Sequence, residues 1–425
     1  MSISKNDIEG FNGKNSSQHQ LKLAYALSTI EQSEEVINKL IDFQIAIPSW
    51  ALGTGGTRFG RFAGGGEPRS LEEKIADVGL LHALNQSSGA ISLHIPWDIP
   101  QNPGAIKALA GQYGLKFDAV NSNTFQDQPN QEFSYKFGSL QHVDRGVRKQ
   151  AIEHNIEVIK HGIELGSDAL TVWLSDGSCF PGQLNFRRAF ENTLEGLQEI
   201  YAALPDDWKV FVEYKAFEPN FYSMTVGDWG QSLLYASKLG DKAYTLVDLG
   251  HHLPNANIEQ IVALLMMEGK LGGFHFNDSK YGDDDLTVGS IRPYQLFLIF
   301  NELISGQQDN NPPFGKKGFG WMIDASHNVK DPLEDLLQAV EAIMITYAQA
   351  LLVDKKKLNE AQLNNDVVLA QEILQTAFRT DTRALVAEAR LRTGGALSPL
   401  GLFREKEIRK QLIQQRGAKA IATGL

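Results

Sequence analysis

Eight short runs of apolar, β-branched and aromatic residues, separated by longer segments of helical periodicity, constrain the fold of this chain most strongly. Near-continuous apolar strands that alternate with helices are typical of a parallel sheet whose outer face is covered by helices. The runs are residues 43–50, 89–96, 115–124, 168–176, 208–215, 243–252, 270–279 and 320–328. Because a closed barrel of this kind needs eight strands, we predict an α/β fold, a (β/α)8 TIM barrel.

A doubly wound open sheet is the alternative, and it usually carries a short Gly-rich turn of the form GxGxxG after its first strand. The glycine-rich segment 53–68 follows the first strand here, but it is long and is interrupted by arginine and phenylalanine. We therefore interpret residues 53–66, which include Phe59, as a mobile lid that excludes water during turnover. An ordinary surface loop is the simpler interpretation of the same segment.

The two ends of the chain differ from the middle. Residues 1–20 are polar and are expected to be frayed, whereas residues 21–42 repeat apolar positions at helical spacing. After residue 331 the pattern is helical to the end. We therefore predict an N-terminal tail and helix (1–42), a barrel (43–332), and a C-terminal helical extension (333–425) that packs on the barrel or on another subunit.

Composition excludes several classes of function. The net charge of −11 argues against a general nucleic-acid or anionic-membrane binder, which needs a basic face. Cys179 is the single cysteine, so an internal disulfide is impossible and a reducing compartment fits. The sequence shows no signal-peptide pattern and no apolar stretch of the length that a transmembrane helix needs. We expect a soluble protein of the cytoplasm.

Ionisable side chains recur at the ends of the predicted strands. Glu213, Asp248, His275 and Asp324 come from the fifth to the eighth strand, one from each. The carboxyl ends of all barrel strands open onto one face, so these four side chains should converge. Three converging carboxylates repel one another unless a cation neutralises them. Each residue by itself is more typical of a helix cap, but together the four predict a divalent-metal site.

A second group of candidate ligands lies close in sequence: His251, Asp283 and Asp285. In an extended loop Asp283 and Asp285 point the same way, whereas Asp284 faces solvent. A solvated turn is the simpler interpretation of three consecutive aspartates. Carboxylates and imidazoles without a thiolate suit Mn²⁺, Co²⁺, Mg²⁺ or Zn²⁺, and Mn²⁺ lies in the middle of that preference.

Three tryptophans, Trp50, Trp97 and Trp173, lie at or just past strand ends. Aromatic rings beside polar groups commonly stack on the C–H faces of sugars, although filling of the barrel rim would also explain them. With a metal site nearby, these rings favour a small polyol substrate.

Several segments together resemble L-rhamnose isomerase, and more closely the broad-specificity bacterial branch of that family. The segments are SWALGTGGTRFGRF (49–62), SLHIPWD (92–98), NSNTF (121–125), LTVWLSDGSCFPGQ (170–183), VDLGHH (247–252), GGFHFNDSKYGDDD (272–285) and MIDASHNVKDP (322–332). The resemblance runs from about residue 43 to the C-terminal helices. It implies a TIM barrel, a homotetramer and two divalent metal ions per subunit, usually Mn²⁺. It also implies conversion of L-rhamnose to L-rhamnulose, with activity on other pairs such as D-allose and D-allulose.

The resemblance assigns roles to individual residues. Glu213, Asp248, His275 and Asp324 match the first, structural metal site. His251, Asp283 and Asp285 match the second, catalytic one, and Glu213 is a candidate bridge between the two. Lys215 matches a lysine near the substrate O1 and His94 a histidine near the sugar ring or its O5, so the candidate catalytic residues are His94, Lys215, Asp283 and Asp285. The candidate substrate-binding residues are Trp50, Phe59, His94, Trp97, Phe125, Trp173 and Lys215.

Other functions fit a metal-bearing barrel, because fold does not fix the reaction. The rivals are a sugar epimerase, a metal-dependent hydrolase and a non-catalytic sugar-binding protein. For an isomerase, we favour direct transfer of hydrogen between the two carbons, with the hydroxyl protons relayed near Asp283 and Asp285. Proton transfer through an enediol is the alternative.

Overall fold

A computed structural model describes residues 3–52, 62, 64–174, 177–218, 224–308, 318–326 and 329–418. The eight predicted runs all contain strands, and two of the runs are split into two short strands each. The strands are β1 (Ala46–Pro48), β2 (Ala90–Ser92), β3 (His94–Ile95), β4 (Lys116–Phe117), β5 (Val120–Asn123), β6 (Ala169–Trp173), β7 (Lys209–Glu213), β8 (Ala243–Asp248), β9 (Leu271–Phe276) and β10 (Gly320–Ile323).

The strand pairing closes into a barrel. β1 pairs in parallel with β2 on one side and with β10 on the other. β2 pairs with β4 and β3 pairs with β5, so the split strand β2–β3 lies between β1 and the split strand β4–β5. From β5 to β10 each strand pairs in parallel with the next. Because β10 returns to β1, eight parallel strand runs form the predicted TIM barrel.

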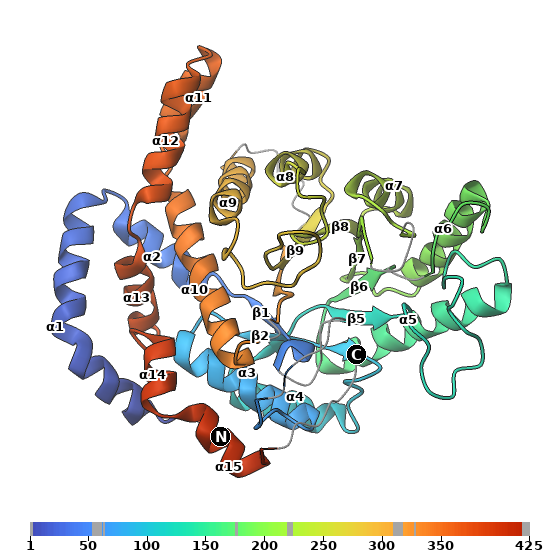
Figure 1. Ribbon diagram of the computed structural model, residues 1–425, viewed down its shortest axis with the longest axis horizontal. Helices are drawn as coiled ribbons and strands as arrows, with labels where there is room; N and C mark the ends of the chain where they lie inside the picture. The colour runs from blue at the N-terminus through green and yellow to red at the C-terminus, as the bar shows by residue number, and fades with distance from the viewer. Residues whose placement is uncertain are drawn as a thin grey trace.

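One long helix follows each strand run and covers the outside of the barrel (Figure 1). These helices are α3 (Leu71–Asn85), α4 (Pro103–Gln112), α5 (Arg145–Leu165), α6 (Phe186–Ala202), α7 (Trp229–Leu239), α8 (Ile258–Met267), α9 (Pro293–Gln308) and α10 (Pro332–Leu351). α10 packs against both α9 and α3 and thus completes the ring. We therefore place the end of the barrel at Leu351 instead of at residue 332, which the sequence pattern had suggested.

Local sequence signals set where these helices begin. The side chains of Ser70, Asp144, Asn185 and Asp228 each accept a hydrogen bond from a backbone N–H in the first turn of the following helix. Such caps satisfy donors that have no partner within the helix. At α10 the cap is Asp331, and Pro332 follows at the first helical position. The start of each of these helices is therefore fixed by its own local sequence.

Alternation along the strands divides the barrel interior into layers. Ala119, Ala169, Phe211, Tyr244 and Leu246 pack together as one apolar cluster. Two residues further along their strands, Glu213 follows Phe211 and Asp248 follows Leu246 on the same side. The apolar layer therefore closes the interior below a polar layer at the carboxyl ends of the strands.

The N-terminal segment differs from the sequence expectation. α1 spans Lys5–Thr29 and α2 spans Ser33–Asp42, so residues 5–20, which we expected to be frayed, are helical. Ser4 and Asp7 form a reciprocal capping box at the start of α1. α1 lies beside α13 (Arg383–Arg392), and buried His19 contacts Glu388 of that helix at 2.9 Å. Tertiary packing therefore orders a segment whose apolar residues do not gather on one face.

The remaining helices are α11 (Lys355–Leu363), α12 (Val367–Arg379), α13, α14 (Pro399–Glu405) and α15 (Ile408–Arg416). α11 and α12 form a hairpin that projects from the body of the molecule (Figure 1). α15 returns to the barrel. The guanidinium of Arg416 donates two hydrogen bonds of 2.7 Å to the carboxylate of Asp77 on α3, and a third of 3.2 Å to the carbonyl of Gly66.

Among the described helices, none is by itself long and apolar enough to cross a membrane. α10 and α11 pass that test only as a pair with a 64° bend between them. Many of the side chains of α10 are buried in the protein.

Candidate metal centre

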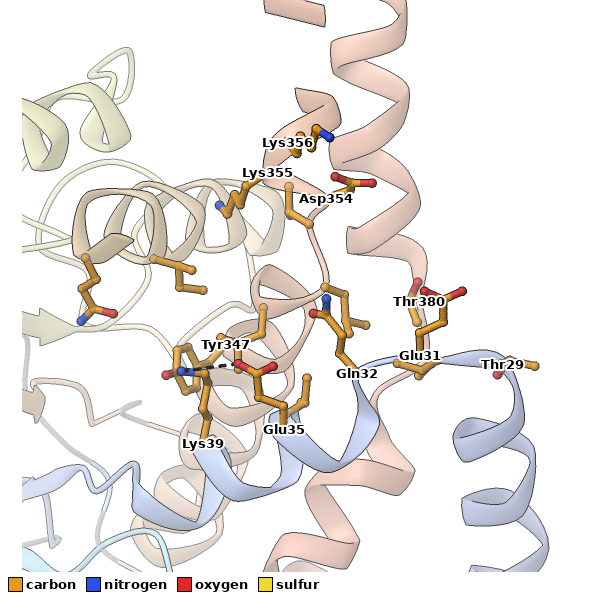
Figure 2. Close-up of a pocket in the computed structure, with 17 residues that line it drawn as sticks. Thr29, Glu31, Gln32, Glu35, Lys39, Tyr347, Asp354, Lys355, Lys356 and Thr380 are labelled. Atoms are coloured by element: carbon orange, nitrogen blue, oxygen red, sulfur yellow. Dashed lines mark ion pairs between the residues drawn. The ribbon is translucent and has the colours of Figure 1, made fainter. Parts of the chain in front are cut away.

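Hollows on the outer surface do not carry the predicted chemistry. One of about 690 Å³ lies at the corner between α2, α10 and α11 (Figure 2). Its charged side chains include Glu35 and Lys39, a pair 3.9 Å apart in which both partners are largely exposed to solvent. The one compact group of metal-type ligands among the described residues lies elsewhere, at the barrel mouth. We therefore take the barrel mouth as the candidate site.

A narrow cavity of about 110 Å³ lies at the carboxyl ends of the strands, where a TIM barrel carries its active site. Both acidic side chains and aromatic rings line it. Its lining residues are Trp50, His94, Asn121, Ser122, Asn123, Phe125, Gln126, Trp173, Glu213, His251, His275, Asp283, Asp285 and Asp324.

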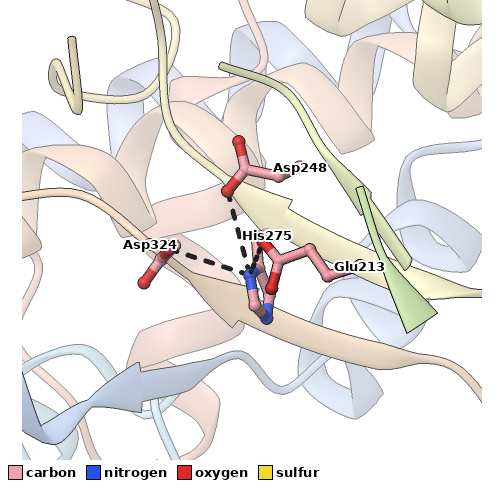
Figure 3. Close-up of side chains that lie close together, drawn as sticks. All are labelled: Glu213, Asp248, His275 and Asp324. Carbon is pink, nitrogen blue, oxygen red and sulfur yellow. Dashed lines mark hydrogen bonds and ion pairs between the residues drawn. The ribbon is translucent and has the colours of Figure 1, made fainter. Parts of the chain in front are cut away.

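Four of the predicted ligands form the acidic cluster. Ligand atoms of Glu213, Asp248, His275 and Asp324 all lie within 4.8 Å of one another. His275 Nδ1 is the common centre: it lies 3.1 Å from Glu213 Oε1, 3.8 Å from Asp248 Oδ2 and 3.7 Å from Asp324 Oδ2 (Figure 3). Each residue comes from the end of a different strand, β7 to β10, as the sequence predicted. These four side chains could bind a metal ion.

The electrostatics of this cluster favour a cation. Burial raises the pKa of Asp248 well above its ordinary value, and the carboxylates of Glu213 and Asp324 raise it further. Burial disfavours protonation of His275, but Glu213, Asp324 and Asp248 outweigh this effect and raise its pKa to about 10. The buried cluster is therefore short of positive charge, which a divalent cation would supply.

The hydrogen bonding of the cluster also fits a metal ion. Asp248 Oδ2 is buried and has no hydrogen-bond partner among the described residues, whereas Oδ1 accepts from the backbone N–H of Gly250 at 2.8 Å. Trp50 Nε1 donates to Asp324 Oδ1 at 2.8 Å. An unpaired buried carboxylate oxygen is costly, and a bound cation would satisfy it. The residues present therefore fit a divalent ion.

The second predicted ligand set is less compact. His251 Nε2 lies 2.9 Å from Asp283 Oδ1, and the ammonium of Lys215 forms ion pairs with both Asp283 and Glu218. Asp285 is also buried and lines the cavity. Within the described part of the chain, however, His251, Asp283 and Asp285 do not form a tight group like the first one.

His251 is held from behind by the strand next to it. Its Nδ1 lies 2.9 Å from the carbonyl oxygen of Tyr214, and the hydroxyl of Tyr214 lies 2.6 Å from His252 Nε2. A carbonyl can only accept, so Nδ1 carries the proton. When the ring is protonated, Nε2 donates a hydrogen bond to Asp283. When the ring is neutral, Nε2 carries a lone pair that can bind a cation. Tyr214 itself points away from the cavity, as strand alternation requires.

A buried polar network supports His94. Its Nδ1 lies 3.5 Å from Ser49 Oγ, which in turn donates to the carboxylate of Asp98. Asp98 also accepts from Lys74 Nζ at 2.7 Å. Burial lowers the pKa of His94 to about 3; Asp98 opposes this shift, and His275 and Lys74 add to it. His94 is therefore a neutral imidazole at the edge of the cavity.

Phe125, Trp173 and Trp97 form an aromatic wall beside the acidic residues. Phe125 packs edge-on against Trp173 with ring centroids 4.6 Å apart, and Trp97 lies 6.4 Å from Phe125. Trp173 stacks on the ring of His251 at 6.2 Å, and Lys215 Nζ lies 5.2 Å from the Trp173 ring centroid. The wall therefore connects directly to the second ligand set.

The structure brings most of the predicted site residues to one cavity. Asp248, Lys215 and Trp97 are not among the described residues that line it: Asp248 lies in the metal cluster, Lys215 pairs with Asp283, and Trp97 packs against Phe125. Phe59 and most of the predicted lid lie outside the described residues. Four polar lining residues lie outside the predicted site set: Asn121, Ser122, Asn123 and Gln126. Their signal was their place at and just after the end of the third strand run.

Comparison with known proteins places the chain in a family. No protein-family profile matches the sequence. A probable sugar isomerase of Mesorhizobium japonicum is 53% identical over 388 residues, covering 91% of this chain and 89% of the relative. A probable sugar isomerase of Rhizobium meliloti is 53% identical over 382 residues, covering 90% of this chain and 88% of the relative.

Among solved structures, an L-ribulose 3-epimerase has the same barrel fold, with a TM-score of 0.50 at 14% sequence identity. The superposition covers 76% of this chain and 98% of that protein, and it bears on the fold only. The relatedness at the sequence level is much closer and extends over nearly the whole length of both chains. The chain therefore belongs to the family of these probable sugar isomerases.

Proposed function

We propose that this chain is a divalent-metal-dependent isomerase that interconverts an aldose and its 2-ketose. The proposed reaction is of the L-rhamnose to L-rhamnulose type, with activity on other pairs such as D-allose and D-allulose. One observation supports it most: three carboxylates and an imidazole converge at a narrow cavity that aromatic rings also line. The names of the 53%-identical relatives, probable sugar isomerases, agree with it.

Glu213, Asp248, His275 and Asp324 would hold the first ion, and His251, Asp283 and Asp285 the second. Mn²⁺ is the proposed ion, and Co²⁺, Mg²⁺ and Zn²⁺ are alternatives with compatible ligand preferences. Bound there, the ions would act as Lewis acids that orient and polarise neighbouring sugar oxygens. The hydrogen bond from Trp50 to Asp324 fixes one ligand before any ion or sugar arrives.

The remaining side chains would orient the sugar and handle its protons. His94, neutral because burial lowers its pKa to about 3, can accept a hydrogen bond from a sugar hydroxyl through Nε2 while Nδ1 faces Ser49. Lys215 forms ion pairs with Asp283 and Glu218, and we propose that its Nζ donates a hydrogen bond to O1 of the substrate. Phe125 and Trp173 would contact the apolar face of the sugar.

We also propose that the protein is a homotetramer that acts in the cytoplasm. The tetramer rests on the resemblance to L-rhamnose isomerase, and the location rests on composition and the single cysteine.

The test is an activity assay on a panel that includes L-rhamnose and D-allose. EDTA-stripped protein is assayed with and without added Mn²⁺, and ketose formation is measured. Asp248→Asn should abolish the metal-restored activity, because it removes a buried ligand charge. Asp366→Asn is the matched control, since Asp366 is an exposed helix cap on α12 and asparagine caps equally well.

Metal-restored conversion of an aldose to a ketose would support the proposal and rank the substrates. Inversion of one stereocentre with the carbonyl unmoved would instead identify an epimerase. Stoichiometric metal binding without conversion of any sugar would point to a hydrolase or a non-catalytic sugar-binding protein.

A further inference from the structure

Asn277 connects the ends of three strands behind the metal cluster. It lies one residue after β9 and two after His275, and only 2% of its surface is exposed. Its side-chain Nδ2 donates to Asp248 Oδ1 at the end of β8, over 2.9 Å. The same nitrogen donates to the backbone carbonyl of Asp324, just after β10, over 3.1 Å. Both amide hydrogens are therefore directed at residues of the metal cluster.

The two oxygens of Asp248 have different surroundings because of this contact. Oδ1 accepts two hydrogen bonds, one from the N–H of Gly250 at 2.8 Å and one from Asn277. Oδ2 has no hydrogen-bond partner among the residues described, and it lies 3.8 Å from His275 Nδ1 inside the cluster. A carboxylate held through one oxygen cannot rotate freely, so Oδ2 is left as its ligand atom.

The orientation of the Asn277 amide follows from its neighbours. Its nitrogen faces two groups that can only accept, a carboxylate oxygen and a carbonyl oxygen, so a flipped amide would lose both hydrogen bonds. Its Oδ1 packs against Gly250, where a Cβ would lie 2.9 Å from that oxygen. A side chain at residue 250 would therefore push the amide out of place.

Asn277 is not among the described residues that line the barrel cavity; it lines a separate small hollow beside Leu249 and Ile258. Asn277 can therefore affect the site only through the two residues to which it donates hydrogen bonds, Asp248 and Asp324. We propose that Asn277 is a positioning residue: it fixes the Asp248 carboxylate so that Oδ2 is presented to a divalent ion, and it holds the ends of β8 and β10 at the spacing that the ion requires. This inference rests on the proposed function only in that it needs an ion at the four-residue cluster, and it does not depend on which sugar is converted.

The test measures metal binding directly. Asn277→Ala removes both hydrogen bonds. Gly250→Ala keeps the asparagine side chain but displaces its amide by steric contact with the new Cβ. Loss of such a supporting contact should weaken Mn²⁺ binding about 10- to 100-fold in titration calorimetry of EDTA-stripped protein. The absorption spectrum of bound Co²⁺ should also change, because the spectrum reports ligand geometry and a purely structural role would leave it unchanged.

Asn155→Ala is the matched control. Asn155 on α5 is also a fully buried asparagine whose Nδ2 donates to a backbone carbonyl, that of Ala151 at 2.9 Å, but it is not part of the cluster or the cavity lining. The Mn²⁺ affinity of the Asn155→Ala variant should match that of the parent protein.

Two outcomes overturn the inference. If Asn277→Ala and Gly250→Ala both bind Mn²⁺ as tightly as the parent, with unchanged Co²⁺ spectra, Asn277 does not position the ligand. If the parent protein binds no divalent ion, the inference fails together with the proposed metal centre. A parent that binds Mn²⁺ and isomerises sugars, with variants that bind equally well, would refute the role of Asn277 and leave the proposed function in place.

Discussion

Replacing Arg416 with methionine should lower the free energy of unfolding by about 3–5 kcal/mol, because it leaves a buried carboxylate without its partner. The side chains of Arg416 and Asp77 are each 2% exposed, and two hydrogen bonds of 2.7 Å join them. Burial raises the pKa of Asp77, and Arg416 offsets part of that rise. Methionine keeps most of the side-chain volume of arginine but lacks its charge. The decrease in the free energy of unfolding therefore reflects the unpaired carboxylate of Asp77 more than a cavity.

The assay is urea-induced unfolding followed by tryptophan fluorescence. Without Arg416 the pKa of Asp77 in the folded state should rise further above its unfolded value. The folded protein then binds the extra proton in the window between the two pKa values, so stability falls as pH rises through that window. The deficit should therefore be larger at neutral than at mildly acidic pH. The double variant Asp77→Leu with Arg416→Met should recover much of the loss, because an apolar pair needs no counter-charge. A single variant that loses less than about 1 kcal/mol would refute this reasoning.

Three further predictions concern the metal centre and its wall. Because neighbouring carboxylates raise the pKa of His275 to about 10, a metal that takes this imidazole as a ligand must displace a proton. The affinity for Mn²⁺ should therefore rise up to about tenfold per pH unit above neutrality. Titration calorimetry in two buffers of different ionisation enthalpy should count the released proton. Trp50→Phe removes the 2.8 Å hydrogen bond to Asp324 and should weaken Mn²⁺ binding about tenfold; a raised KM with unchanged metal affinity would show instead that Trp50 serves only as a wall. Phe125→Ala removes a ring that packs against Trp173 and should lower kcat/KM for the best sugar about tenfold while the affinity for Mn²⁺ stays constant. An equal loss of Mn²⁺ binding would contradict the separation of the aromatic wall from the metal centre.

The barrel and the first ligand set could be predicted because both follow from local periodicity. Strand alternation places Glu213 and Lys215 on one side of β7 and Tyr214 on the other, and the structure shows this arrangement. The rule that all strand ends meet at one face then brings Glu213, Asp248, His275 and Asp324 together without any knowledge of distances.

Contacts between distant segments could not be predicted in this way. The sequence analysis expected residues 1–20 to be frayed, because the packing of α1 on α13 depends on residues more than 350 positions away. The ion pairs of Lys215 depend on how the loop carrying Asp283 folds back. An asparagine after a strand is most often a turn former, so the sequence alone gives Asn277 no role in the cluster.

The barrel mouth is divided into two arcs that come from different parts of the chain. The four clustered metal-type residues lie at or just after the ends of β7 to β10, whereas Trp50, Phe125 and Trp173 lie at or just after the ends of β1, β5 and β6. Three of the contacts described above connect the arcs: the hydrogen bond from Trp50 to Asp324, the stacking of Trp173 on His251, and the approach of Lys215 Nζ to the Trp173 ring. Substitutions in the loop after β5 should therefore alter which sugar the proposed enzyme accepts and leave the proposed ion site intact.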